Sequence, residues 1–331
     1  MKSAVIELAG KLGGYQLARV LTRKQPKILM YHRFSAQKKG HEVTAATFEQ
    51  QLQLIKRYFQ PMTLAVLAQT IKQTARAPDN AVVITVDDGY RDFYEVAYPL
   101  LKHYQVPATF FVTTGFVNQD LWLWPDQVLW ILRNRTCSTG SLIVGDKTFD
   151  LTESVKELWW PLVLHLLTVE NHIRLSAIAE LTRCSEVSLP STAPDEFSAV
   201  TWAQLEEMQQ QGIEIGGHTL SHPSLGHMPA TEAQVEINGS FDVLRQHLGD
   251  RPRTFCYPNG QPADYSEEIK KVVSQSGFLA AVTAYSDQFN TDIPWAWRRF
   301  VGSEAWFQFN KSLFGVEHLG NILRKTTRCN Y

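Results

Sequence analysis

The sequence has little of what marks several common classes of protein. Its 331 residues carry 32 Lys and Arg against 33 Asp and Glu, a net charge of -1 and a pI near 6.8. Binding nucleic acid through its phosphates needs an excess of positive charge, so we expect no nucleic-acid partner. Four widely spaced cysteines show no disulfide or zinc-knuckle pattern, which indicates reduced structural thiols of a cytosolic protein. They are Cys137, Cys184, Cys256 and Cys329.

The first 25 residues lack an uninterrupted apolar run and a small-residue cleavage site. This pattern excludes a membrane span and argues against a secretory signal. Apolar residues alternate with Lys and Arg, which predicts an amphipathic helix at 1–25. That helix either packs on the domain or lies on a membrane surface. We therefore expect a cytoplasmic protein, with a peripheral site at the inner face of the membrane as the alternative placement.

The chain is organised around residues 81–90, which read AVVITVDDGY. A run of β-branched and apolar residues predicts a strand buried on both faces, and it leads directly into Asp87, Asp88 and Gly89. Two unpaired carboxylates are costly to bury, so they need a partner. Where a strand turns at a glycine, both side chains can point into one cleft. This arrangement suits a metal and its base, while the simpler alternative is that both aspartates only cap the next helix.

A candidate metal partner follows another short apolar run that ends in glycines, at 212–217. His218 and His222 come next, four residues apart. Such a pair is weak on its own, because histidines at this spacing also occur by chance on helices. Combined with a strand that ends in Asp-Asp-Gly, it indicates a metal site.

Alternating strand and helix patterns predict parallel strands joined by crossover helices. The expected fold is an α/β, distorted (β/α)7-type barrel that spans residues 26–331. Segments with strand character are 27–31, 81–86, 108–112, 213–217, 254–257, 279–283 and 297–301. Helices are predicted at 47–58, 63–73, 93–104, 201–211 and 231–248. The active site of such a barrel lies at the carboxyl ends of its strands, where six candidate residues would meet: His32, Asp87, Asp88, His218, Tyr257 and Arg299.

An insertion at about 118–198 interrupts this alternation of strands and helices. Helical patterns at 124–133 and 152–169 flank a hairpin at 141–150 that turns at Gly-Asp. Five tryptophans lie here, and they either anchor a core or stack on sugar rings. We expect the insertion to cover part of the barrel mouth.

Four motifs resemble those of the polysaccharide deacetylase family, also called the NodB-homology family. The first two are TVDDGY at 85–90 and HTLSH at 218–222, and two more are VPATFFV at 106–112 and FCYPNG at 255–260. The resemblance covers roughly residues 27–115 and 200–301. It implies a metal-dependent hydrolase that removes N-acetyl groups from N-acetylglucosamine-type units.

The resemblance also implies roles for individual residues. Asp88, His218 and His222 would hold a divalent metal, most readily Zn²⁺, with Co²⁺ or Ni²⁺ as alternatives. Asp87 would act as the base, kept ionised by the metal and by a nearby cation. Arg299 is the candidate for that cation, and a bridge to a surface acid is its alternative role.

The remaining roles concern the leaving group and the oxyanion. His32 ends a Tyr-His strand that resembles a permuted last strand of the family fold, so it is the candidate acid, with His318 ranked second. The backbone N–H of Tyr257, next to Pro258, would help to bind the oxyanion.

The chain departs from the family pattern at two places. It lacks the usual arginine before the proline of the third motif, where Arg253 or Arg299 would have to substitute, and it lacks the C-terminal Leu-x-His motif. A glycan-binding protein with a metal site but little activity therefore stays an alternative, as does a hydrolase of another small amide. The expected partner is an acetylated glycan, and the absence of a secretion signal favours a lipid-linked or unexported intermediate of exopolysaccharide synthesis.

Overall fold

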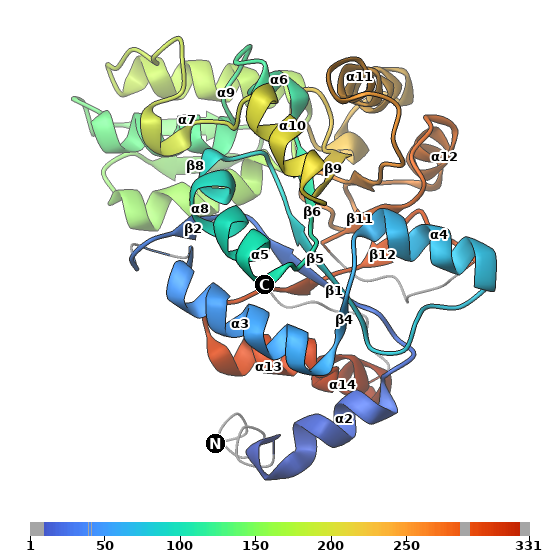
Figure 1. Cartoon of the computed structure of the whole chain (residues 1–331). Coiled ribbons are helices and arrows are strands. Elements are labelled where there is room, and N and C mark those ends of the chain that lie inside the picture. Colours follow the sequence, from blue (N-terminus) through green and yellow to red (C-terminus); the bar gives the residue numbers. More distant parts are fainter. Residues whose placement is uncertain (1–9, 39, 41, 285–291, 325–331) are drawn as a thin grey trace.

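The computed structural model describes residues 10–38, 40, 42–284 and 292–324. One parallel sheet forms a nearly closed barrel in this part of the chain (Figure 1). Its strands run in the order β12-β11-β10-β9-β6-β5-β1-β13, and a short strand β4 also pairs with β5. The bounds are β1 Lys27–Tyr31, β4 Gln60–Pro61, β5 Ala81–Val86, β6 Thr109–Val112, β9 Glu214–Gly217, β10 Phe255–Cys256, β11 Ala281–Thr283, β12 Trp297–Arg298 and β13 Phe300–Val301. The predicted α/β barrel is confirmed.

The last predicted strand, 297–301, closes the barrel in two halves. Its first half, β12, pairs with β11 through Val282 and Trp297, and its second half, β13, pairs with β1 through Leu29 and Phe300. Arg299 lies at the break between the halves. Residues 297–301 therefore bridge the two ends of the sheet, and Arg299 is placed where they meet.

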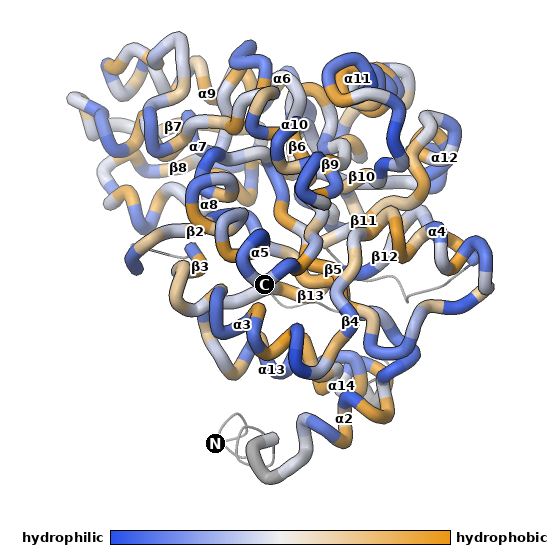
Figure 2. Tube along the Cα trace, in the orientation of Figure 1, coloured by the Kyte–Doolittle hydropathy of each residue, from blue (hydrophilic) through white to orange (hydrophobic). Residues whose placement is uncertain are grey.

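Amphipathic helices surround the barrel. The strands appear as apolar bands and the helices alternate apolar with polar residues along their length (Figure 2). Capping side chains start several helices: the Thr63 hydroxyl accepts from Val66 N, as predicted, but the preceding helix begins at Ala45 rather than 47 because Thr44 caps it. The helices are α3 Ala45–Tyr58, α4 Leu64–Thr74, α5 Tyr98–Tyr104, α10 Trp202–Gln210, α11 Ala230–Leu248, α12 Glu267–Gln275, α13 Trp306–Leu313 and α14 Val316–Arg324.

The insertion has a hydrophobic core of its own. Helix α6 Thr114–Val117 precedes it, and it contains α7 Trp124–Asn134, the hairpin β7 Ser141–Val144 with β8 Lys147–Asp150, α8 Val155–Leu166 and α9 Asn171–Cys184. Buried side chains between residues 124 and 181 form one cluster, and the segment lies beside the barrel (Figure 1). The hairpin, α7 and α8 were predicted, whereas α9 was not. Trp124 and Trp122 are buried, so these two serve as core residues.

Only part of the predicted N-terminal helix lies within the described residues, because 1–9 lie outside them. A π-helical turn, Gly10–Gly14, precedes α2 Tyr15–Leu21, so the described part is not one regular α-helix. Tyr15 stacks on Phe314 at 5.3 Å between ring centroids, and Ala18 is buried. One face of α2 thus packs on the domain. Among the described helices, none is long and apolar enough to cross a membrane.

Candidate active site and metal centre

The catalytic candidates Asp87 and Asp88 lie where β5 ends. Asp87 continues the strand, since its N–H donates to Tyr31 O at 3.0 Å. The backbone then turns sharply, with φ of +80° at Asp88 and +105° at Gly89. A non-glycine residue at positive φ costs about 1–3 kcal/mol, and such strain is typical of functional sites. The turn directs both carboxylates to the same end of the barrel, as predicted from the glycine.

Asp87 forms a two-point ion pair with Arg299 inside the barrel mouth. Arg299 Nη1 donates to Asp87 Oδ1 at 2.6 Å and Arg299 Nη2 donates to Oδ2 at 2.7 Å. Both residues are buried, at 2% and 1% exposure. Burial alone would raise the pKa of Asp87, but the charge and hydrogen bonds of Arg299 outweigh it, and the pKa lies below its usual range. Asp87 is therefore an ionised carboxylate, and the predicted pairing with Arg299 is present.

His32 lies on the solvent side of this pair. Its Nε2 is 3.7 Å from Asp87 Oδ2, and its side chain is 46% exposed. The histidine directly follows β1, the strand next to β5. It is thus at the mouth of the barrel and within reach of an incoming molecule.

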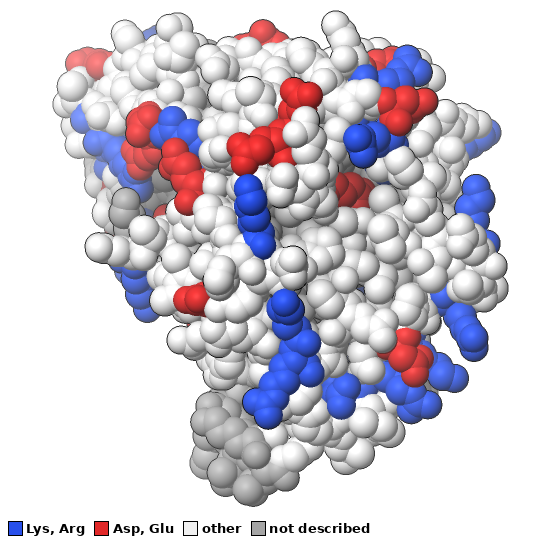
Figure 3. Space-filling view, in the orientation of Figure 1, with Lys and Arg blue, Asp and Glu red and all other residues white. Residues whose placement is uncertain are grey.

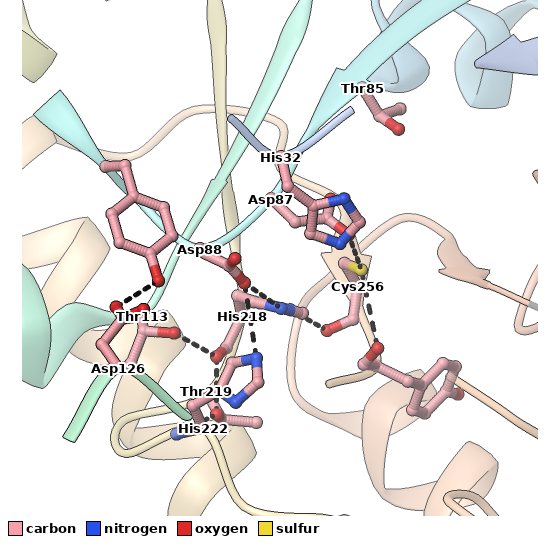
Figure 4. A network of polar contacts seen from close by, with 12 residues as sticks. His32, Thr85, Asp87, Asp88, Thr113, Asp126, His218, Thr219, His222 and Cys256 are labelled. Carbon is pink, nitrogen blue, oxygen red and sulfur yellow. Dashed lines mark hydrogen bonds and ion pairs between the residues drawn. The ribbon is translucent and has the colours of Figure 1, made fainter. Parts of the chain in front are cut away.

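Asp88, His218 and His222 form a compact set of metal donors. The Nε2 atoms of both histidines lie 3.4 Å from Asp88 Oδ1, and one ligand atom from each residue lies within 4.8 Å of the others. Figure 4 shows the three side chains turned toward one another, with His32 beside Asp87. One carboxylate and two imidazoles suit zinc or a neighbouring transition metal.

The pKa shifts of Asp88 and His222 agree with metal binding. Hydrogen bonds from the two histidines outweigh burial and hold the pKa of Asp88 well below its usual range. Burial lowers the pKa of His222, which favours the neutral imidazole that ligates metals. The other ring nitrogen of His218, Nδ1, lies 2.8 Å from the carbonyl oxygen of Cys256. A backbone partner of this kind orients a metal-binding histidine and directs its Nε2 to the ion.

A second set of donors, Asp87, His218 and Cys256, also lies within ligand distance. It fits a metal poorly, because Arg299 already occupies both oxygens of Asp87 and its Nη2 lies 3.1 Å from Cys256 Sγ. Burial also raises the pKa of the Cys256 thiol, while a metal needs the thiolate. The set that contains Asp88 is therefore the better metal site.

The loop that carries the histidines is strained and tightly held. Thr219 and His222 have φ of +67° and +60°, so the pair lies on a loop rather than on a helix. The carboxylate of Glu236, on α11, accepts from Leu220 N and Ser221 N, both at 2.9 Å. Hydrogen bonds of this kind keep an unfavourable backbone conformation in place.

Comparison with known proteins now places the chain. The family model for polysaccharide deacetylase matches residues 74–281, more than half of the sequence. The chain belongs to the polysaccharide deacetylase family.

Curated relatives of this family member are bacterial. It is 24% identical over 267 residues to a putative polysaccharide deacetylase, YxkH, of Bacillus subtilis, covering 80% of this chain and 67% of that protein. It is 34% identical over 89 residues to poly-beta-1,6-N-acetyl-D-glucosamine N-deacetylases of Staphylococcus aureus, covering 26% of this chain. The match spans only 31% of the length of those staphylococcal proteins.

Solved structures share the fold of this chain. The Streptococcus pyogenes deacetylase PplD, in complex with acetate, superposes with a TM-score of 0.57 at 18% identity, covering 92% of this chain and 98% of that one. IcaB from Ammonifex degensii gives a TM-score of 0.55 at 19% identity, covering 87% and 97%.

The predicted oxyanion role of Tyr257 and Pro258 is not supported by the geometry of the site. The N–H of Tyr257 donates to Val282 O at 3.2 Å between β10 and β11, so it is not free to bind an oxyanion. The Tyr257 side chain is buried and donates to Trp295 O, and Pro258 lies directly after it, also buried. The oxyanion prediction for Tyr257 and Pro258 is therefore corrected: the N–H is consumed by the sheet ladder.

The alternative acid, His318, lies at the wrong end of the barrel. Burial and the charges of Lys27 and Arg298 lower its pKa to about 4. Lys27 begins β1, whereas His32 follows the end of the same strand. A histidine close to Lys27 is thus on the side opposite the metal donors.

Several residues of the site carried no clear sequence signal. Cys256 was predicted to be a structural thiol, yet its sulfur lies 3.5 Å from Asp87 Oδ2 and 3.1 Å from Arg299 Nη2. Glu236 was an ordinary helix residue in the sequence. The place of the cysteine within the third motif is a signal that could have found it, but nothing marks Glu236, because its partners are 15 and 16 residues away.

Proposed function

We propose that this chain is a metal-dependent hydrolase that removes N-acetyl groups from N-acetylglucosamine-type residues of a polysaccharide, an oligosaccharide or a lipid-linked glycan intermediate. The observation that carries the proposal is the ionised Asp87, paired with Arg299, directly beside the donor set of Asp88, His218 and His222. A metal-binding protein needs only the donor set. Hydrolysis also needs a base next to the metal.

A divalent ion held by Asp88, His218 and His222 would supply a water of lowered pKa and polarise the acetyl carbonyl oxygen. Asp87 takes the proton from the water as it attacks the carbonyl carbon. Arg299 keeps Asp87 ionised before this step and fixes both of its oxygens, so the carboxylate cannot rotate away.

His32 completes the reaction on the open side of the site. As an imidazolium it donates a proton to the amide nitrogen while the C–N bond breaks. The products are acetate and a free amine on the sugar. The exposure of His32 supports this role, because the leaving amine belongs to the large glycan and has to lie at the mouth.

The substrate class is inferred from similarity to the family and to the relatives. The Staphylococcus aureus relatives are named for deacetylation of poly-beta-1,6-N-acetyl-D-glucosamine, and the PplD deacetylase is in complex with acetate, which is a product of deacetylation. Both observations support an acetylated glycan as the substrate. Zn²⁺ is our proposed metal, since two imidazoles and one carboxylate are typical zinc ligands.

The test is acetate release from N-acetylglucosamine oligomers by zinc-loaded protein. The variant Asp87→Asn should bind zinc as the wild type does and lose activity by roughly 100-fold or more, as expected for a general base. A protein that binds zinc but releases no acetate from oligomers or from lipid-linked sugars would instead be a glycan-binding protein.

We also propose that α2 contacts the inner face of a membrane peripherally, in a cytoplasmic protein. Leu17, Val20 and Leu21 are 62%, 46% and 65% exposed on its outward face. Lys24 lies shortly after the end of α2 and is exposed, and Lys and Arg side chains gather over the lower part of the molecule in Figure 3. This combination suits anionic lipid. Flotation with anionic vesicles should recover the wild type but not Leu17→Ser/Leu21→Ser, and equal flotation of both would contradict the proposal.

A further inference from the structure

The end of the insertion pairs with the turn that carries the metal-binding aspartate. Val200 N donates to Gly89 O at 3.0 Å, and Arg91 N donates to Ser198 O at 2.9 Å. The backbone directly after Asp88 is therefore held by residues 198–200 rather than by the barrel alone.

The beginning of the insertion holds the same turn through a side chain. The hydroxyl of Tyr90 donates to Asp126 Oδ2 at 2.5 Å, and Asp126 lies in the first turn of α7. Both side chains are 6% exposed. On its face, the ring of Tyr90 is covered by the guanidinium of Arg33, at 3.9 Å from the ring centroid. Tyr90 is thus fixed at its hydroxyl by the insertion and at its ring by the barrel.

These contacts stabilise the turn at Asp88 and Gly89, whose backbone conformation is unfavourable on its own. Asp88 and Gly89 both have positive φ, which aspartate rarely adopts. A conformation of this kind persists when surrounding contacts over-determine it. Tyr90 is the first side chain after the turn, so its position sets the direction in which the chain leaves Asp88.

A carboxyl group is unfavourable at a buried position that needs only packing, so Asp126 should have a further role. Burial raises the pKa of its carboxyl to about 7, so the group is costly to bury. What the carboxyl provides there is an acceptor for the Tyr90 hydroxyl.

We propose that Asp126 is a positioning residue: through Tyr90 it holds Asp88 in the orientation that binds the metal, and so makes the insertion a working part of the active site. This inference rests on the proposed function in so far as it assumes a metal at Asp88. Asp126 belongs to neither of the donor sets found among the described residues.

The test compares Asp126→Ala, Asp126→Asn and Tyr90→Phe by zinc affinity, measured in competition with a chromophoric chelator. Loss of an outer partner typically weakens metal binding 10- to 100-fold, so Asp126→Ala and Tyr90→Phe should each weaken zinc at least tenfold. Asp126→Asn keeps an acceptor oxygen and should stay within about threefold of the wild type. The double variant Asp126→Ala/Tyr90→Phe should be no weaker than either single one, because both remove the same contact.

A second readout does not depend on metal. In metal-free protein, hydrogen exchange of the Arg91 and Val200 amides should be faster in Asp126→Ala than in the wild type. The matched control is Leu162→Ala, a buried change in the insertion core, which should lower the midpoint of unfolding but leave zinc affinity unchanged.

Three results would overturn the proposal: unchanged zinc affinity in Asp126→Ala, unchanged amide exchange in that variant, or an equal loss of zinc affinity in Leu162→Ala. If the wild type itself binds no zinc, the proposed function fails. Amide exchange then still decides whether Asp126 holds the turn.

Discussion

Two buried carboxyl groups face the site from different parts of the molecule, Asp87 from the barrel and Asp126 from the insertion. They are 2% and 6% exposed, so they are almost equally buried. The charge of Arg299 outweighs burial and lowers the pKa of Asp87, whereas burial raises the pKa of Asp126 to about 7 in spite of its bond from Tyr90. The neighbour, more than the depth of burial, decides the charge. The barrel thus holds a charged carboxylate, and the insertion holds a carboxyl group with a raised pKa.

The largest effect should follow from removing Arg299, the cation that lowers the pKa of Asp87. In Arg299→Met, Asp87 becomes a buried charge without its partner, which typically costs about 3–5 kcal/mol in the free energy of unfolding. Urea denaturation of the metal-free protein measures it. The double variant Arg299→Met/Asp87→Asn should recover much of this stability and remain inactive. If Arg299→Met were as stable as the wild type, the ion pair would not be what stabilises the buried charge of Asp87.

The next effect concerns the second neighbour of Asp87. We expect His32→Ala to lower kcat by about 100-fold or more, since general acids contribute factors of that size. His318→Ala is the matched control, because His318 lies at the other end of β1, and its kcat should be that of the wild type. Equal losses in both variants, measured by acetate release, would refute the assignment of the acid.

Metal removal tests the role of Asp88, which lies between Asp87 and Asp126 in the sequence. At a free zinc concentration 100 times the Kd, binding stabilises the folded state by about 2.7 kcal/mol, so a chelator should lower the Tm of the wild type. His222→Ala should show no zinc-dependent shift, whereas His227→Ala, a change outside the donor set, should keep it. A full shift in His222→Ala would exclude this set of ligands.

The smallest effect is a pH dependence that should differ in sign between the two carboxyl groups. Because the pKa of Asp126 is raised in the folded state, its contribution to stability is present at acidic pH and is lost as the pH rises through about 7. Relative to Asp126→Asn, the wild type should lose about 2.5 kcal/mol in the free energy of unfolding between pH 5 and 7.5. Asp87, with a lowered pKa, contributes stability that is lost only on acidification. Urea denaturation measures the free energy of unfolding at each pH. If this free energy changes by the same amount in wild type and variant across the range, the prediction is wrong.

Much of the barrel could be predicted because its signals are local. The strand before Asp87 is a continuous β-branched run, and Gly89 marks the turn that directs both aspartates to one side. The histidine pair stands out through its spacing, and Arg299 through its place in the last strand. In each case the informative residues lie within a few positions of one another.

The rest depends on partners that are distant in sequence. Asp126 lies 36 residues from Tyr90, and Cys256 lies 43 from Arg299. No periodicity connects such pairs. The error at Tyr257 has the same origin, because the bond from its N–H to Val282 exists only once β11 lies beside β10.

The strand that closes the barrel ties the assembly of the site to the order of synthesis. Residues 297–301 can pair with β1 only after the other described barrel strands have been synthesised, and Arg299 arrives with them. Until then, β1 and β11 are open sheet edges, and the carboxylate of Asp87 has no cation. Contacts this far apart in sequence are slow to form, so the nascent chain should pass through a long interval with exposed edges and an inactive base. Closing the barrel and supplying Asp87 with its cation are thus one folding event.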